Sequence, residues 1–253
     1  MMKEVVIKDV VIGKGRPKII IPVVGKSEQE IIDTFSKINQ EPCDFIEWRI
    51  DHFDDVLEEG AVASLSHKLK EACSKPLLIT FRTQHEGGVC QLGDEGYQKL
   101  YKSIIDDADF ELLDIEMMMP DDMVTTLIEQ AHQKNIKVIL SNHDFDKTPE
   151  KATIIERLTM MEEKGADIAK IAVMPNDKSD VVTLLNATFE RSQVAETPLI
   201  TMSMGQLGMI SRLAGELFGS QASFGALGQV SAPGQAPVED LHNVLNLLTL
   251  NAE

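Results

Sequence analysis

The sequence has few of the residues that hold disulfide-rich or metal-binding proteins together. Among its 253 residues are three cysteines, Cys43, Cys73 and Cys90, with no close pair. An odd count without CxxC spacing argues against a disulfide framework and against a zinc knuckle. The six histidines have no metal-ligand spacing, and no HExxH motif is present. We therefore expect free thiols and no bound metal.

Positive charge and long apolar runs are also scarce. Lysine and arginine number 24 against 41 acidic residues, which gives a formal net charge of -17. Such a chain repels nucleic acids and anionic membrane surfaces, so we expect neither as a partner. The longest apolar runs, such as KIIIPVV at 18–24, are far shorter than the roughly 20 residues that span a bilayer. Residues 1–15 carry charges where a signal peptide needs its apolar region, which indicates a cytoplasmic protein.

What the sequence does contain is a short apolar run that recurs eight times. The runs begin near residues 19, 45, 76, 109, 136, 167, 198 and 222, about 29 residues apart. Eight strand–helix units in about 250 residues predict an α/β fold, a (β/α)8 TIM barrel, with residues 1–253 as a single domain. An open, doubly wound sheet is the alternative, but the turn after the first run, IPVVGKSEQ, has no GxGxxG pattern.

Helix caps and one extra segment complete the expected architecture. Ser27 and Glu30 have capping-box spacing at the start of the first amphipathic stretch. In the stretch after the fifth run, Thr148 is the expected N-cap, and Gly165 is the expected end of the helix. Residues 4–13, EVVIKDVVIG, precede the first unit, and we expect them to form a β-hairpin that closes the N-terminal end of the barrel.

A lysine interrupts the sixth apolar run, DIAKIAVMP at 167–175. An ammonium group is costly to bury without a partner, so Lys170 calls for an explanation. Other runs also carry polar residues on one face near their C-terminal ends, where barrel active sites lie. These residues are Glu47, Arg49, Thr80, Arg82, Asp114, Glu116, Ser141 and His143. Their convergence indicates one polar cavity, although any single one could instead form a structural ion pair.

The residues suggest a chemistry for such a cavity. With apolar neighbours and with Arg49 and Arg82 nearby, we expect the charged form of Lys170 to be disfavoured. A neutral lysine amine attacks ketones to form a Schiff base, which is an electron sink and needs no cofactor. His143 ends the neighbouring run and is the candidate general base, with Glu86 as the group that fixes its tautomer. A lone histidine at a strand end can also be purely structural.

Six motifs resemble those of the type I 3-dehydroquinate dehydratase family, in order and in spacing. They are EWRID (47–51), FRTQHEGG (81–88), SNHDF (141–145), AKIAVMP (169–175), MSMGQLGMISR (202–212) and QVSAPGQ (229–235). The resemblance covers nearly the whole chain, and its specificity comes from six motifs in register. One departure is at the end of the first run, where some members have a serine and this chain reads IIIPVVG. We therefore assign no site residue in that run.

The resemblance implies an activity and a role for each site residue. It implies that Lys170 forms an imine with the C3 ketone of 3-dehydroquinate. It also implies that His143, paired with Glu86, removes a C2 proton and assists loss of the C1 hydroxyl. This syn elimination gives 3-dehydroshikimate, the third step of the shikimate pathway, and the family's usual bacterial state is a homodimer. The implied substrate-binding residues are Arg212 for the carboxylate, Glu47, Arg49 and Arg82 for the ring hydroxyls, and Ser231 and Gln235 on a closing loop.

Two other functions remain open at this point. A class I aldolase would use the same barrel and lysine but would need a phosphate site, normally in glycine-rich loops after the seventh and eighth strands. SMGQLG (203–208) and GALGQ (225–229) allow such a site, whereas Arg212 fits a carboxylate better. The chain could also be a catalytically inactive barrel that acts as a binding or regulatory module. The presence of both Lys170 and His143 argues against that reading.

Overall fold

Parallel strands form one curled sheet in the computed structural model, which describes residues 2–228 and 230–250. The order of neighbours is β11-β10-β3-β4-β5-β6-β7-β8-β9, and a bridge between Leu199 and Ser220 joins the two sides. The strands are β3 (Lys18–Val23), β4 (Phe45–Arg49), β5 (Leu77–Thr80), β6 (Leu112–Glu116), β7 (Lys137–Asp144), β8 (Ile168–Val173), β9 (Leu199–Ser203), β10 (Ala222–Ala226) and β11 (Ala236–Pro237). Each of the eight apolar runs contains one long strand, so the predicted barrel is confirmed.

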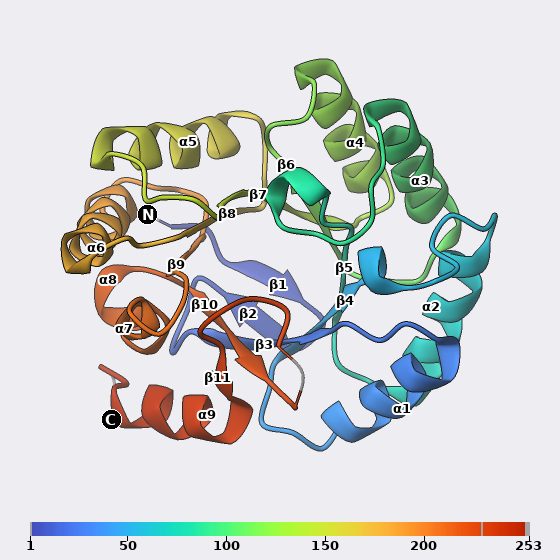
Figure 1. Ribbon diagram of the computed structural model, residues 1–253, viewed down its shortest axis with the longest axis horizontal. Helices are drawn as coiled ribbons and strands as arrows, with labels where there is room; N and C mark the ends of the chain where they lie inside the picture. Colours follow the sequence, from blue (N-terminus) through green and yellow to red (C-terminus); the bar gives the residue numbers. More distant parts are fainter. Residues whose placement is uncertain (1, 229, 251–253) are drawn as a thin grey trace.

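Helices alternate with the strands and cover the outside of the barrel (Figure 1). They are α1 (Glu28–Ile38), α2 (Ala61–Ala72), α3 (Asp94–Asp107), α4 (Asp121–Gln133), α5 (Lys151–Glu163), α6 (Lys178–Ser192), α7 (Met209–Leu213), α8 (Gly215–Phe218) and α9 (Val238–Leu247), with short 3-10 turns η1 (Ile50–His52) and η2 (Gln84–Glu86). No helix in the described part of the chain is both long enough and apolar enough to cross a membrane.

Of the three predicted helix ends, two are confirmed and one is wrong. The hydroxyl of Ser27 accepts the Glu30 amide at 3.4 Å and caps α1 as expected. The prediction that Thr148 caps α5 is wrong, because its hydroxyl donates to the Met174 carbonyl and the helix begins at Lys151. Gly165 follows α5 in the left-handed region, with φ of +88°, and confirms the predicted end.

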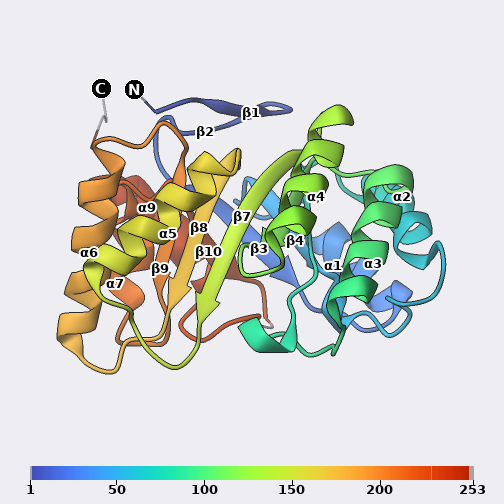
Figure 2. The same cartoon turned by 90° about the horizontal axis from the view of Figure 1, so that it is seen from above.

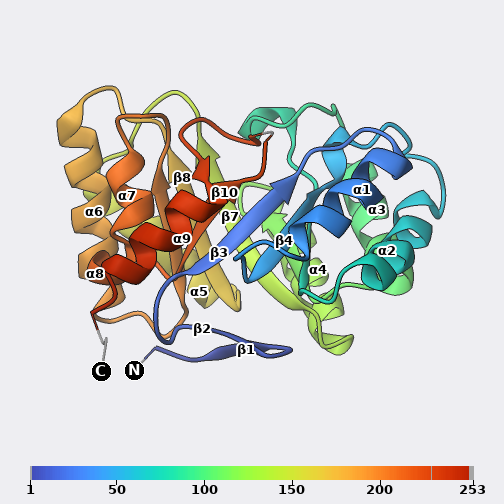
Figure 3. The same cartoon turned by 90° about the horizontal axis from the view of Figure 1, so that it is seen from below.

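The N-terminal end of the barrel is closed by the predicted hairpin. Strands β1 (Val5–Ile7) and β2 (Val10–Ile12) pair antiparallel and lie across this end, away from the loops that follow the long strands (Figures 2 and 3). Their inward side chains join an apolar cluster formed by the first inward residues of the barrel strands. The cluster contains Val5, Ile7, Ile12, Ile20, Phe45, Leu78, Leu112, Ile139, Ile168 and Ile200. The barrel interior is therefore apolar at this end, and its polar groups lie at the other.

Candidate active site

The structure brings the nine residues predicted for the site around one cavity. The cavity lies at the C-terminal ends of the strands. The predicted residues that line it are Glu47, Arg49, Arg82, Glu86, His143, Lys170, Arg212, Ser231 and Gln235. Apolar side chains complete the wall, namely Phe145, Ala172, Met202, Met204 and Phe224.

Lys170 lies in the middle of β8 and points into the barrel. Its side chain is almost fully buried, with 3% of the residue exposed. Its Nζ donates to Oδ2 of Asp114 at 3.0 Å and lies 3.7 Å from Oε1 of Glu47. It also lies 4.7 Å from the centre of the Phe224 ring. The expectation of apolar neighbours with Arg49 and Arg82 nearby is therefore incomplete, because two buried carboxylates face this ammonium group.

These four side chains come from alternate strands of the barrel. Glu47 belongs to β4, Asp114 to β6, Lys170 to β8 and Phe224 to β10. Parallel eight-stranded barrels fill their interior with layers of four side chains, each layer supplied by alternate strands. Here three of the four side chains in one such layer are polar, and one of the three is the lysine. Asp114 thus reaches Lys170 across the barrel interior, although the two residues are 56 positions apart.

Asp114 was noted in the sequence but not assigned to the site. It is fully buried and accepts hydrogen bonds from Arg82 Nη2 at 2.7 Å and from Ser141 Oγ at 2.6 Å, besides the one from Lys170. Burial by itself would raise the pKa of this carboxyl, but Arg82 and Lys170 outweigh it and lower the pKa to about 2. Asp114 is therefore a permanent anion behind the lysine.

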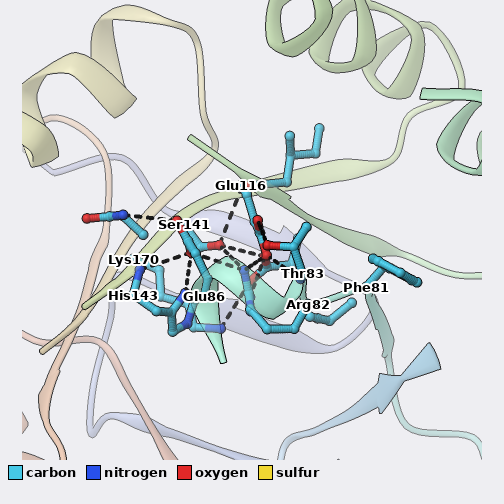
Figure 4. A network of polar contacts seen from close by, with 12 residues as sticks. Phe81, Arg82, Thr83, Glu86, Glu116, Ser141, His143 and Lys170 are labelled. Atoms are coloured by element: carbon cyan, nitrogen blue, oxygen red, sulfur yellow. Dashed lines mark hydrogen bonds and ion pairs between the residues drawn. The ribbon is translucent and has the colours of Figure 1, made fainter. Parts of the chain in front are cut away.

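Arg82 follows β5 and is enclosed by acidic and hydroxyl groups. Its Nη1 donates to Glu116 Oε1 and to Ser141 Oγ, both at 3.0 Å, and lies 3.5 Å from Glu86 (Figure 4). Burial opposes its charge, but Asp114, Glu116 and Glu86 hold the pKa of the guanidinium well above its usual value. Arg82 thus links the carboxylate beside Lys170 to the carboxylate beside His143.

His143 lies in β7, and Glu86 in η2 holds its ring. The Nδ1 of His143 lies 2.8 Å from Oε2 of Glu86, and its backbone amide donates to the same oxygen at 3.0 Å. Asn142 donates to the other oxygen of Glu86 at 3.0 Å. A carboxylate that accepts the Nδ1 proton leaves Nε2 free to accept another. The predicted pairing of His143 with Glu86 is thus present in the geometry.

Burial governs the protonation of this pair. Burial, with the charges of Arg82 and Lys170, lowers the pKa of His143 well below its usual value. Burial also raises the pKa of Glu86 to about 8, where Arg82 opposes the rise and Glu116 adds to it. Two groups in contact titrate as a unit. Once the pair has lost its shared proton, it presents a neutral imidazole beside an ionised carboxylate, which is the form of a general base.

Arg49 is held by a residue that the sequence reading did not assign. Its Nε and Nη2 each donate to one oxygen of Asp51 at 2.8 Å, in a bidentate pair. Asp51 also accepts the backbone amides of Arg82 and Val89, each at 3.3 Å. It therefore ties the segment after β5 to the end of β4. The signal was present in the motif EWRID, whose last residue is Asp51.

Arg212 differs from the other two arginines of the cavity, Arg49 and Arg82, because no carboxylate of the described residues compensates its charge. It is 2% exposed, and among residues 2–228 and 230–250 no carboxylate pairs with it. Its Nη2 donates to the Pro233 carbonyl at 3.1 Å, and its Nε has no hydrogen-bond partner in the described chain. Burial alone lowers the pKa of this guanidinium to about 10. A buried cation without an anionic partner at a cavity wall is a ready site for an anionic ligand group.

The predicted closing loop, residues 228–237, lies over the cavity, although Gln229 is outside the described residues. Its two candidate substrate contacts are hydrogen-bonded to each other. The backbone amide of Ser231 donates to Oε1 of Gln235, and Nε2 of Gln235 donates to Oγ of Ser231, both at 3.0 Å. These two bonds do not use the hydroxyl hydrogen of Ser231 or the second N–H of Gln235, so both side chains can still donate to a ligand.

Comparison with known proteins agrees with the motifs. The model of a family described as type I 3-dehydroquinase matches residues 19–252. The 3-dehydroquinate dehydratase of Enterococcus faecalis is 45% identical over 252 residues, which cover 99% of this chain and 100% of that protein. The Bacillus subtilis 3-dehydroquinate dehydratase is also 45% identical, over 99% of both chains. A crystal structure of the type I enzyme from Clostridium difficile with covalently modified comenic acid has a TM-score of 0.94 at 44% identity and covers 98% of each chain. The chain belongs to the type I 3-dehydroquinase family.

Proposed function

We propose that this protein is a 3-dehydroquinate dehydratase, a hydro-lyase that converts 3-dehydroquinate into 3-dehydroshikimate in the shikimate pathway. The observation that carries the proposal is the content of one cavity: the Lys170 amine, the His143–Glu86 base and the uncompensated Arg212 guanidinium. An amine can bind a ketone covalently, and a guanidinium can bind a carboxylate. 3-Dehydroquinate carries both groups. Relatives that bear this enzyme's name and are 45% identical over 252 residues support the proposal.

The reaction begins at Lys170. The lysine loses one proton, and its Nζ lone pair attacks C3 of the substrate ketone to give a carbinolamine. The C3 oxygen then leaves as water, and a C3=N bond forms that carries one N–H and a positive charge. This cationic imine withdraws electrons from the neighbouring C2–H bond, so no metal or other cofactor is required for the next step.

His143 then moves the proton. Its Nε2 takes the C2 proton, the C2–H electron pair becomes a C2=C3 bond, and the imine nitrogen becomes a neutral enamine. The enamine electrons return, C1=C2 forms, the C1–O bond breaks, and His143 gives the same proton to the departing hydroxyl. One base acting twice on one face is a syn elimination. Water finally adds to C3 and releases the product from Lys170, so that the net loss is one water molecule.

The remaining cavity residues position the substrate. We infer that Arg212 binds the carboxylate and that Glu47, Arg49 and Arg82 order the ring hydroxyls, Arg82 in part through its contacts with neighbouring carboxylates. The long-range field of a chain with a net charge of -17 opposes an anionic substrate. Salt screens that field beyond about 8 Å, so Arg212 acts at short range.

Other expectations extend this proposal to the whole protein. We infer that residues 1–253 act as one barrel domain, since the hairpin shares an apolar cluster with the barrel strands. A cytoplasmic homodimer without nucleic-acid or membrane partners fits the acidic composition and the resemblance to bacterial members of the family.

The function is tested by incubating the purified protein with 3-dehydroquinate and following the ultraviolet absorbance of the conjugated enone in 3-dehydroshikimate. We expect a rise in absorbance that depends on the protein. In a parallel incubation with a sugar phosphate, cleavage of that compound, with no absorbance rise from 3-dehydroquinate, would identify an aldolase instead. Absence of both activities in a folded protein would favour a binding module.

The protonation of the His143–Glu86 pair predicts the pH dependence. Because burial raises the pKa of Glu86 to about 8, kcat/KM is expected to fall as the pH drops through this range and the pair takes up its proton. Glu86→Gln removes the anion that stabilises a charged imidazole, so this acid limb should move to lower pH. The plateau should fall less than in His143→Ala, because a carboxamide oxygen still accepts the Nδ1 proton. As a control, Glu190→Gln, in an exposed pair with Lys151, should keep the wild-type profile. An unmoved limb in Glu86→Gln would show that the pair does not titrate as described.

The loop after β10 is expected to close over the imine and exclude water. Amide exchange in residues 230–237 should therefore fall sharply after the imine is trapped with borohydride, while exchange in the hairpin of β1 and β2 stays constant. Replacing Ser231 and Gln235 together with Ala should raise KM and leave the Lys170 adduct in place. Equal exchange of the loop before and after trapping would contradict the closing role without affecting the lysine chemistry.

A further inference from the structure

Asp114 contacts the reactive nitrogen, yet the elimination derived above gives it no task. Its Oδ2 is 3.0 Å from Lys170 Nζ, whereas Glu47 is farther away at 3.7 Å and is hydrogen-bonded to Thr80. Glu47 lines the cavity and is open to a substrate hydroxyl. Asp114 is fully buried and does not line the cavity, so it faces the nitrogen from behind. A ligand in the cavity therefore cannot displace it.

We infer that Asp114 is the counter-ion that keeps the Schiff base of Lys170 protonated, an inference that rests on the proposed imine. The imine nitrogen is the same atom as Nζ, and in its cationic form it retains one N–H that can donate to Asp114. Only this cationic form draws electrons from the C2–H bond, whereas a neutral imine is a poor electron sink. No bond forms or breaks at Asp114, and no proton is transferred to it.

The surroundings show why a counter-ion is needed. The charged and titratable groups that line the cavity or contact the nitrogen are Glu47 and Arg49 of β4, Arg82 after β5, Glu86 of η2, Asp114 of β6, His143 of β7 and Arg212 of α7. Three of them are guanidinium groups, of which Arg212 has no carboxylate partner in the described part of the chain, and burial further disfavours a cationic imine. Without Asp114, the imine nitrogen would lose its proton more readily.

The surrounding residues also fix the orientation and the charge of the Asp114 carboxylate. Arg82 and Ser141 hold its other oxygen at 2.7 and 2.6 Å, so the carboxylate cannot turn away from the lysine. Its pKa of about 2 makes it a poor proton acceptor, and it remains charged throughout the reaction. A fixed, desolvated anion at the nitrogen stabilises a cation there without reorganisation.

The inference predicts a specific pH signature for Asp114→Asn. An opposite charge at this distance commonly shifts a titration by about 1 to 3 pH units. The alkaline limb of kcat, where the imine loses its proton in the bound complex, should move to lower pH by about that amount. At alkaline pH, where the imine is largely deprotonated in both proteins, turnover should be about 10- to 1000-fold below wild type, and it should recover as the pH is lowered. Asp114→Glu, which restores the charge, should recover part of the wild-type profile.

Glu116→Gln is the matched control. Glu116 lies on the same strand, is also buried and also pairs with Arg82, at 3.0 Å. The other hydrogen bonds of its side chain in the described part of the chain are with Thr83, and none is with Lys170. Both variants should lose stability through the damaged Arg82 network, and only Asp114→Asn should move the alkaline limb. An equal shift in both variants, or no shift in Asp114→Asn, would overturn the inference.

A measurement on the wild-type protein completes the test in case Asp114→Asn does not fold. The C=N stretching band of the imine formed with 3-dehydroquinate should shift in D2O at neutral pH, because a protonated imine carries an exchangeable hydrogen. A band that is insensitive to D2O would contradict a counter-ion role. A wild-type protein that forms no imine at Lys170 would refute the proposed function itself, which distinguishes the two failures.

Discussion

Lys170→Ala is expected to abolish turnover of 3-dehydroquinate and to leave the barrel folded. Without the amine there is no imine and hence no electron sink at C3. Loss of a covalent nucleophile commonly lowers kcat by roughly 10⁴- to 10⁶-fold. The matched control is Lys137→Ala, since Lys137 begins β7 at the opposite end of the barrel and pairs with Asp167 at 2.9 Å. It should retain normal turnover. Near-normal turnover in folded Lys170→Ala would rule out the imine mechanism.

The stability of a lysine variant follows from the ion pairs around it. From the sequence alone, we would expect removal of a buried charge to be neutral or stabilising. The structure changes this expectation, because Lys170 compensates Asp114 and Glu47. Lys170→Met keeps the volume, and Arg82 still pairs with Asp114 at 2.7 Å. We expect a loss smaller than the roughly 3–5 kcal/mol of an unpaired buried charge, measured by chemical denaturation.

His143→Ala is expected to have the second largest effect. A positioned general base commonly contributes about 10²- to 10⁴-fold to kcat, and here one residue serves both proton transfers. Imine formation requires only Lys170, so borohydride should still trap an adduct, and the adduct should accumulate. The control is His132→Ala, because His132 also contacts a carboxylate, Asp167 at 2.8 Å, but lies on α4 outside the cavity.

A different kinetic result would show that His143 has no role in proton transfer. If His143→Ala raises KM while kcat at saturation stays normal, the histidine only binds the substrate. A loss in Glu86→Gln as large as that in His143→Ala would mean that the carboxylate does more than orient the ring and tune its protonation.

The sequence predicted the parts of the fold that depend on local patterns. Strand positions follow from short apolar runs, and the inward direction of Lys170 follows from the two-residue alternation along β8. The cap at Ser27 was predicted because its hydroxyl competes for a nearby amide. The cap predicted at Thr148 is wrong, because its hydroxyl donates to the carbonyl of Met174, which is 26 residues away. A long-range partner of this kind leaves no trace in local spacing.

The lack of long-range information in local sequence patterns also explains which features of the site were predicted and which were not. The direction of each polar side chain was visible, so the cavity could be anticipated. Apart from Glu86 for His143, the partners were not visible. Asp114 meets Lys170 across the barrel, and Asp51, two residues after Arg49, faces it only because the chain turns in η1. One signal could have identified Asp114. In a barrel, alternate strands supply one interior layer, and the acidic residue of the fourth run and the lysine of the sixth satisfy that rule.

The most direct test of the account is reductive trapping. The protein is incubated with 3-dehydroquinate and borohydride, digested, and analysed by mass spectrometry. We predict a stable secondary-amine adduct on the peptide that contains Lys170, formed only when substrate and borohydride are both present, together with loss of activity in proportion to labelling. An adduct on another lysine, or full turnover with no adduct on any lysine, would contradict the account.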